Sequence, residues 1–249
     1  MSAQSAFAEL ARSGGRGALV TNLEGGTEKL LVHHDGRTEG TLGDPVLDEE
    51  AAKHADELMW AERSERRGDL FIDVTFPPPR LIVFGAVDFA AALCKLAKAT
   101  GWRAFVVDPR ARFAQPARFP DAEQVVAAWP EEAFQRLGGN DRATAIAVLT
   151  HDPKLDDAAL VLALRSNAGY IGAMGSRRAQ AKRRERLLAK GIEDAEMERI
   201  SAPIGLDLGA LTAEETALSI MAEIVALKHG RAGGRLIGAR GRIHDAVAA

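Results

Sequence analysis

The 249-residue sequence contains one cysteine, Cys94, and no apolar stretch that approaches the ~20 residues of a membrane-spanning helix. A single cysteine excludes an internal disulfide and any metal site built from several cysteines. The N-terminal segment, MSAQSAFAELARSGG, lacks the basic and then apolar layout of a secretory signal peptide. These absences predict a soluble cytoplasmic protein without a membrane span. Cys94 shares a helical pattern with Ala90 and Ala97, and we interpret it as a small packed residue.

Neither sign of charge dominates the sequence, because 32 Lys and Arg residues stand against 35 Asp and Glu residues, for a formal net charge of −3. This balance excludes a general attraction to nucleic acid or to an anionic membrane surface. Hydrophobic residues make up 47% of the chain and charged residues 27%, which is ordinary for a protein that buries a core.

Three consecutive prolines, Pro77-Pro78-Pro79, form a stiff linker and mark a domain boundary. We predict a small α+β domain over residues 1–76 and a larger α/β domain over residues 80–228. The Gly- and Arg-rich tail, residues 229–249, is predicted to be loosely ordered.

Turn and helix signals divide the first domain into short elements. Asp35-Gly36 predicts a hairpin turn between two strands. Pro45 is predicted to open a helix that continues to about Glu62. The charged run over residues 62–67 is interpreted as the solvated end of that helix.

The segment from Arg80 to Asp108 predicts a β-α-β unit. An apolar run over residues 81–84 ends at Gly85, and apolar residues then recur every three or four positions, as in a helix. A second apolar run over residues 104–107 ends at Asp108. The sequence separation between Gly85 and Asp108 is typical of dinucleotide-binding units, in which the acid at the end of the second strand binds a ribose hydroxyl.

The phosphate-binding pattern of that unit, G-x-G-x-x-G/A, is incomplete because Val87 replaces its second glycine. Asp88 also adds negative charge where a helix N-terminus would otherwise attract an anion, unless Asp88 simply caps the helix. We therefore predict a Rossmann-like parallel sheet, and NAD(P) binding stays an alternative.

Ligands of open parallel sheets bind beyond the carboxyl ends of the strands, which makes the residues after each predicted strand the candidates. The turn over residues 172–176 enters a helix that carries Arg177 and Arg178 in its first turn, where the helix dipole disfavours cations unless an anion binds nearby. The alternative is that both point to water, as we predict for Lys182, Arg183, Arg184 and Arg186.

Two further segments extend the candidate site. His151 is either a ligand contact or a structural residue, and no second His or Cys nearby indicates a metal site. The segment over residues 202–209 is either one wall of a ligand cleft or a connector with apolar anchors. The candidate cofactor-binding residues are Gly85, Asp88, Asp108, Arg110, Thr150, His151, Gly172, Gly175, Ser176, Arg177, Arg178, Pro203 and Gly205.

The larger domain resembles the XdhC/CoxI family of molybdoenzyme accessory proteins. The resemblance rests on LIVFGAVDFA, VVDPRARFAQPARFP, VLTHDPKLDDAAL, GYIGAMGSRRAQAKRRERL and ISAPIGLDLGALTAEETALSIMAEIVAL, which cover nearly all of residues 80–228. The first domain resembles the family more loosely, through LVHHDGRTEGTLG. Many relatives carry GAGHVA in place of GAVDFA, and a Cys-containing turn in place of Gly43-Asp44-Pro45-Val46.

The resemblance implies a Rossmann-like, nucleotide-binding fold and a homodimer. It also implies a chaperone that binds molybdenum cofactor, a pterin that is a dinucleotide in some clients. The protein would protect the cofactor or help to sulfurate it, and would then hand it to a xanthine dehydrogenase or carbon monoxide dehydrogenase type enzyme. A cysteine desulfurase is a further candidate partner.

Three hypotheses about function follow from the sequence. The leading one is a non-catalytic cofactor-binding accessory protein, with no catalytic residue and no metal ligand assigned. The alternatives are an NAD(P)-dependent oxidoreductase and a regulatory protein that binds a partner through its first domain. Val87, Asp88 and the lack of a catalytic pair argue against the oxidoreductase.

Overall fold

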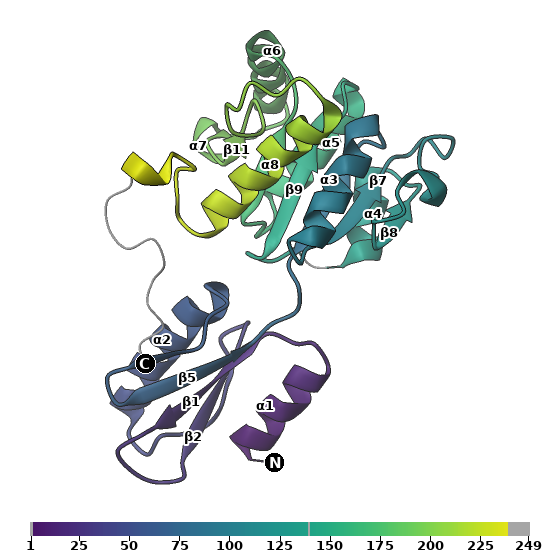
Figure 1. The fold of residues 1–249 in the computed structure, drawn as a ribbon. Coiled ribbons are helices and arrows are strands. Elements are labelled where there is room, and N and C mark those ends of the chain that lie inside the picture. Colours follow the sequence, from purple (N-terminus) through teal and green to yellow (C-terminus); the bar gives the residue numbers. More distant parts are fainter. Residues whose placement is uncertain (1, 139, 239–249) are drawn as a thin grey trace. The chain divides into compact units, whose positions relative to one another are not determined.

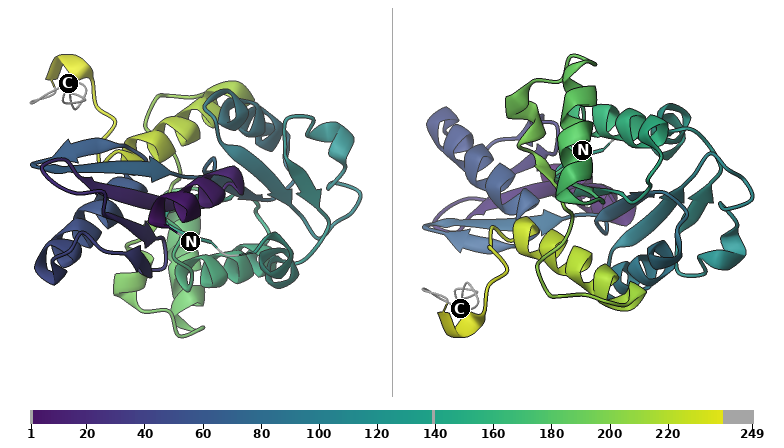
Figure 2. Two further views of the ribbon diagram at one scale, coloured as in Figure 1. Left: turned by 90° about the horizontal axis from the view of Figure 1, so that it is seen from below. Right: turned by 90° about the horizontal axis from the view of Figure 1, so that it is seen from above.

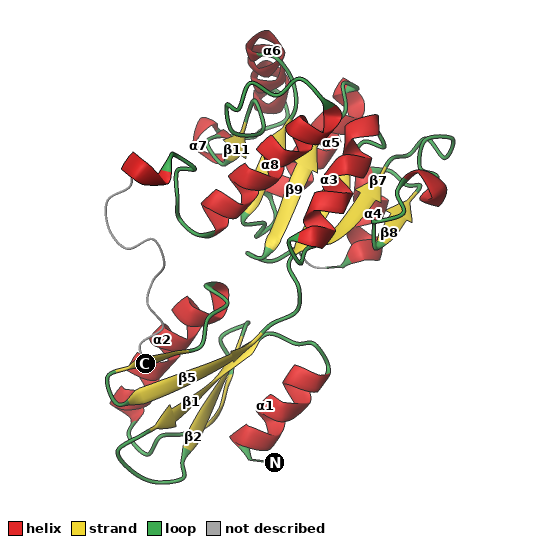
Figure 3. Cartoon of the chain, in the orientation of Figure 1, coloured by secondary structure: helices red, strands yellow, loops and turns green. Residues whose placement is uncertain are grey.

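The computed structural model describes residues 2–138 and 140–238. The chain divides into two compact units, with the boundary between Pro77 and Pro78 (Figure 1). Figure 3 distinguishes the helices of each unit from the strands. The predicted loosely ordered tail is described only as far as residue 238, where it includes a short 3-10 helix, and residues 239–249 lie outside the described residues.

The first unit is an antiparallel sheet with the strand order β3-β2-β1-β5-β4. Its elements are α1 (Ala3–Arg12), β1 (Gly17–Asn22), β2 (Lys29–His33), β3 (Thr38–Gly40), α2 (Pro45–Trp60), β4 (Glu65–Arg67) and β5 (Leu70–Thr75). Helices α1 and α2 lie on opposite faces of this sheet (Figures 1 and 2). The predicted hairpin is confirmed, since β2 and β3 flank Asp35-Gly36 and Gly36 has a φ of +83°.

Alternating side chains of the strands form the core of the first unit. Ala18, Val20 and Leu30 pack with Leu58 and Met59 of α2. Because successive side chains of a strand point to opposite faces, this period-2 pattern places the core on the α2 side of the sheet.

The prediction that residues 62–67 are a solvated helix end is wrong. Helix α2 ends at Trp60, and Glu65–Arg67 forms the edge strand β4, which pairs with β5. The charged side chains are neutralised within the unit, for example between Arg63 and Glu65 at 2.7 Å and between Arg67 and Glu57 at 3.2 Å. Ion pairs and main-chain pairing therefore hold a strand that has no apolar pattern.

The second unit is a six-stranded parallel sheet with the order β11-β10-β9-β6-β7-β8. Its strands are β6 (Arg80–Phe84), β7 (Arg103–Val107), β8 (Gln124–Val126), β9 (Thr144–Val148), β10 (Tyr170–Ala173) and β11 (Ile200–Ser201). Its helices are α3 (Asp88–Ala99), η1 (Pro116–Arg118), α4 (Pro130–Leu137), α5 (Pro153–Leu164), α6 (Arg177–Leu188), α7 (Asp194–Met197) and α8 (Ala213–Lys228). This strand order is that of the Rossmann fold, as the sequence predicted, and the chain direction across the sheet reverses between β6 and β9. The two-residue strand β11 was not predicted.

Two hydrophobic clusters cover the faces of this sheet. Leu81 and Val83 of β6 point to the face covered by α3 and α8, where Leu93 and Ile220 pack. Ile82 and Phe84 belong to the second cluster, on the face that α5 covers. Both faces are buried, which explains why the strands read as continuous apolar runs. No helix within residues 2–138 and 140–238 is both long and apolar enough to cross a membrane.

Candidate ligand site at the strand tips

Gly85 forms the turn after β6, at the point where the order in which the chain adds strands to the sheet reverses. Its φ is +113°, and a Cβ on this residue would lie 2.7 Å from Cγ2 of Thr150 and 3.2 Å from the Thr150 amide nitrogen. Only glycine fits this conformation and this close approach. The turn therefore brings the tips of β6 and β9 together, where doubly wound sheets bind ligands.

Asp108 lies at the tip of β7 and is fully buried. Its carboxylate accepts hydrogen bonds from the Ala86 amide at 3.0 Å and from Arg110 through the amide, Nε and Nη2 at 2.8–2.9 Å. Burial alone raises the pKa of this carboxyl, but the bonds from Arg110 and Ala86 outweigh burial and hold the pKa below its ordinary value. The Asp108 carboxylate, which was predicted to bind a ribose, thus accepts a hydrogen bond from the Ala86 amide, directly after the turn glycine.

The loop after β7 is fastened to the start of α3 by Arg118. Its guanidinium lies 2.9 Å from the Asp88 carboxylate and donates to the backbone oxygens of Ala86 and Phe113 at 3.1 and 3.0 Å. Asp88 is the first helical residue of α3 and not its cap, since Val87 occupies the cap position without a side-chain hydrogen bond. Asp88 and Val87 together leave the N-terminus of α3 poorly suited to a phosphate.

Thr150 is buried after β9, and its hydroxyl donates to Asp156 and accepts from the Asp152 amide. Asp152 caps α5, with Pro153 at the first helical position. His151 is exposed between them. Thr150 therefore shapes this loop, while His151 faces outward.

The turn before α6 joins a glycine in the positive-φ region to a capped helix N-terminus. Gly175 has a φ of +132°, and the hydroxyl of Ser176 accepts a hydrogen bond from the Ala179 amide at 3.3 Å. Arg177 and Arg178 follow in the first turn and are exposed. Within the described residues, neither guanidinium makes a hydrogen bond or ion pair.

The prediction that Arg183 and Arg186 face water is wrong. Arg183 is buried and donates to Asp156 at 3.0 Å and to the Met174 backbone oxygen at 2.8 Å. Arg186 donates through Nε and Nη2 to the buried carboxylate of Asp157, at 2.9 Å for each nitrogen. The physical reason is the acid pair on the inner face of α5, which draws both guanidiniums inward.

Asp156 joins two of the strand tips. One carboxylate oxygen accepts from Thr150 and the other from Arg183, which also holds the main chain just before Gly175. Burial raises the pKa of Asp156, and the hydrogen bonds from Thr150 and Arg183 oppose that rise. Asp156 was not among the predicted site residues, although an acid within the apolar stripe of a helix signals a buried cationic partner.

The segment after β11 folds back over the end of β10. The Ile204 amide donates to the last residue of β10, Ala173, at 3.1 Å, and the Gly205 amide donates to Glu223 of α8 at 2.8 Å. The Tyr170 hydroxyl also donates to Glu223. The segment that contains Pro203 and Gly205 thus lies at a strand tip, with Ile204 as an apolar anchor.

Gly172 allows this close approach of Ile204 to β10, because a Cβ there would lie 2.5 Å from Ile204 Cδ1 and 2.6 Å from the Tyr170 hydroxyl.

Cys94 takes no part in the site. It is fully buried on α3, and burial raises the pKa of its thiol to about 12. This agrees with the packed, unreactive residue that the sequence predicted.

Comparison with known proteins decides the family. The model of the XdhC Rossmann domain matches residues 81–224, more than half of the chain. The chain belongs to the XdhC family. The matched range runs from β6 into α8, so it includes every strand tip described above.

Three relatives share part of this chain. It is 34% identical over 157 residues to a probable xanthine dehydrogenase subunit of Bacillus subtilis (63% of this chain and 45% of the relative). It is 28% identical over 152 residues to the molybdenum cofactor insertion chaperone PaoD of Escherichia coli, a match that covers 61% of this chain and 41% of the relative. It is 25% identical over 228 residues to YqeB of the same organism, a match that covers 84% of this chain and 42% of the relative. The matches thus span less than half the length of each relative.

A solved structure shares the fold of this XdhC-family chain. The crystal structure of a xanthine dehydrogenase from Bacillus halodurans superposes with a TM-score of 0.64 at 24% sequence identity. The superposition covers 89% of this chain and 65% of the other.

Proposed function

We propose that this protein binds molybdenum cofactor at the strand tips of its second unit and hands it to a molybdoenzyme client. Membership of the XdhC family supports this proposal, as does the similarity to relatives named as a molybdenum cofactor insertion chaperone and as a probable xanthine dehydrogenase subunit. The observation that carries it is the pair of guanidiniums in the first turn of α6, Arg177 and Arg178, which have no partner among the described residues.

The residues at the tips fit the anionic end of such a cofactor. The pterin carries a phosphate, and charge-assisted hydrogen bonds from Arg are among the strongest contacts that a protein offers to phosphate. The Gly175 turn and the helix dipole of α6 add backbone amides and positive potential. The bound cofactor would supply the metal and its sulfur ligands, whereas Arg177 and Arg178 would hold its phosphate.

The finer parts of the proposal rest on the family resemblance. We propose a xanthine dehydrogenase or carbon monoxide dehydrogenase type client, a pterin with or without an attached nucleotide, and a homodimer in the cytoplasm. A cysteine desulfurase is the proposed source of sulfur. The protein itself is proposed to be a carrier without a catalytic residue.

The geometry disfavours the alternative of an NAD(P)-dependent oxidoreductase. That function needs a free carboxylate at Asp108 and a free amide in the turn that follows Gly85. In this structure the Ala86 amide of that turn donates a hydrogen bond to the Asp108 carboxylate, so neither group is free. Titrations with NAD(P)H and with molybdenum cofactor, side by side, separate the two functions.

Alanine substitutions in α6 test the proposal. We expect Arg177→Ala or Arg178→Ala to weaken cofactor binding about tenfold or more, since a hydrogen bond to a charged group contributes roughly 1.5–3 kcal/mol. Lys182→Ala is the matched control, because Lys182 is an exposed cation beyond the first turn of the same helix. Circular dichroism confirms that each variant is folded. Equal small effects at all three positions would mean that α6 holds no anion.

A further inference from the structure

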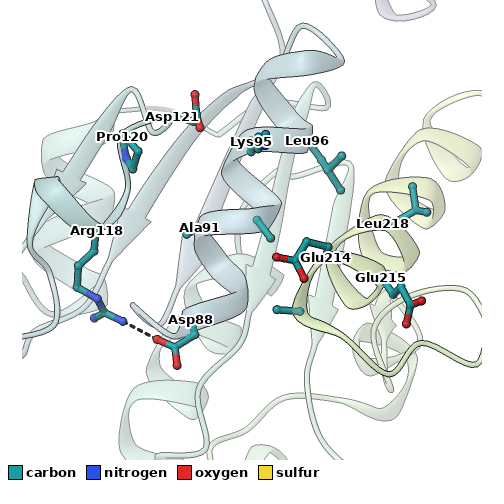
Figure 4. Close-up of a pocket in the computed structure, with 12 residues that line it drawn as sticks. Asp88, Ala91, Lys95, Leu96, Arg118, Pro120, Asp121, Glu214, Glu215 and Leu218 are labelled. Carbon is teal, nitrogen blue, oxygen red and sulfur yellow. Dashed lines mark hydrogen bonds and ion pairs between the residues drawn. The ribbon is translucent and has the colours of Figure 1, made fainter.

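A trough of about 650 Å³ lies along the outer face of α3, away from the sheet. Its floor is apolar and made of small or partly buried residues, Ala91, Ala92 and Leu96. The first turns of α8 form one wall and the segment from Arg118 to Asp121 forms the other (Figure 4).

The α8 side of the trough exposes leucine side chains. Leu218 lines the wall and is 51% exposed. Leu211 precedes this wall in the chain and is 93% exposed, and its amide donates to Glu215 of the wall at 2.8 Å. Leucines exposed together beside an apolar trough are characteristic of a surface that a partner covers.

Half of the charged residues on the rim are neutralised by neighbours. Arg118 pairs with Asp88, as Figure 4 shows, and Asp121 pairs with Lys98 at 3.0 Å. Three rim charges stay without an ion pair among the described residues. These are the ammonium of Lys95 on α3 and the carboxylates of Glu214 and Glu215 on α8, of which Glu215 accepts hydrogen bonds from two backbone amides.

We propose that this trough docks a short amphipathic helix of a partner protein. The lining residues of α3 recur at helical spacing over two turns, and alanines on a helix face let a second helix approach closely. The docked helix would bury leucine-sized side chains against Ala91, Ala92 and Leu218. A basic flank would meet Glu214 and an acidic flank Lys95.

This docking surface is separate from Arg177 and Arg178, so it does not depend on cofactor binding. A designed helical peptide serves as the probe, with a leucine stripe, lysines along one flank and glutamates along the other. The same peptide with glutamine flanks is its control. Fluorescence anisotropy with the full chain measures both affinities.

We expect saturable binding of the charged peptide, and Leu218→Asp should weaken it at least tenfold, since burying one leucine contributes that much. Leu227→Asp is the matched control and should leave binding unchanged, because Leu227 is 49% exposed on the same helix but does not line the trough. Glu214→Lys should weaken the charged peptide roughly threefold and the glutamine peptide not at all.

Equal losses from Leu218→Asp and Leu227→Asp, or no saturable binding by the folded protein, would overturn the proposal. Sedimentation velocity tests a different occupant. If Leu218→Asp converts a dimer into a monomer while Leu227→Asp does not, the trough binds a second copy of this chain and the partner helix is ruled out. Arg177→Ala should keep peptide binding intact.

Discussion

At the scale of single residues, Asp108 sets the chemistry of its strand tip. It accepts four hydrogen bonds while fully buried, and these bonds hold its pKa below the ordinary value of 3.8. A carboxyl whose pKa is lowered by folding stabilises the fold above its unfolded pKa. That contribution disappears as the pH falls through the folded value.

We expect the free energy of unfolding to fall below about pH 4 in the wild type, and Asp108→Asn to reduce this pH dependence. Near pH 7 the substitution should cost about 1.5–3 kcal/mol, because hydrogen bonds to a charged acceptor are lost. Urea titrations from acid to neutral pH measure both effects. Glu24→Gln, in an exposed loop, is the control. Identical pH profiles for Asp108→Asn and the wild type would contradict this role.

The sequence located Asp108 at a strand tip but could not assign its partner. An acid after an apolar run suits a ribose contact and also suits an internal bond to Arg110, two residues later. Similarly, the sequence could not distinguish the exposed Arg177 from the buried Arg183. Both lie in one basic run, and the difference depends on Asp156 from another helix.

At the scale of elements, α6 is held to α5 by buried charge. Arg183 and Asp156 have side chains that are only 6% and 5% exposed, and they lie 3.0 Å apart. A buried ion pair adds little net stability over an apolar pair, but removal of one partner leaves an uncompensated buried charge.

We expect Arg183→Ala to lower the free energy of unfolding by about 3–5 kcal/mol. The double variant Arg183→Ala with Asp156→Ala should cost less than the sum of the single variants, since neither charge is then left alone. Arg184→Ala is the control, because Arg184 pairs with Asp194 on the surface. Urea unfolding measures each of these values. Strict additivity would show that the two side chains do not interact.

Elements with strong local signals were predicted well. The apolar runs over residues 81–84 and 104–107 became the neighbouring strands β6 and β7. Strands β4 and β11 were missed because their pairing partners, and not their own sequences, define them. A three-residue charged edge strand and a two-residue parallel strand carry no periodic pattern.

At the scale of the whole molecule, separate sets of residues form the cores. Leu58 belongs to the core of the first unit and Leu160 to a core of the second, and both are fully buried. Each unit therefore has the hydrophobic cluster that independent stability requires.

We expect calorimetry to show two unfolding transitions. Leu58→Ala should lower the free energy of unfolding of the first unit by about 2–5 kcal/mol, and Leu160→Ala that of the second unit by the same amount. Each substitution should shift only one transition to lower temperature, because a cavity destabilises only the core that contains it. Fluorescence of Trp60 reports on the first unit, and that of Trp102 on the second. A single transition that shifts with either substitution would show one cooperative unit.

The strand order of the second unit has a consequence during synthesis. Strand β6 pairs with β7 on one edge and with β9 on the other, and β9 begins only at Thr144. A growing chain that has passed β8 therefore exposes the main-chain edge of an apolar strand until β9 leaves the ribosome. Such edges recruit other chains. The time between the emergence of β8 and that of β9 from the ribosome thus sets how long the nascent protein is open to aggregation.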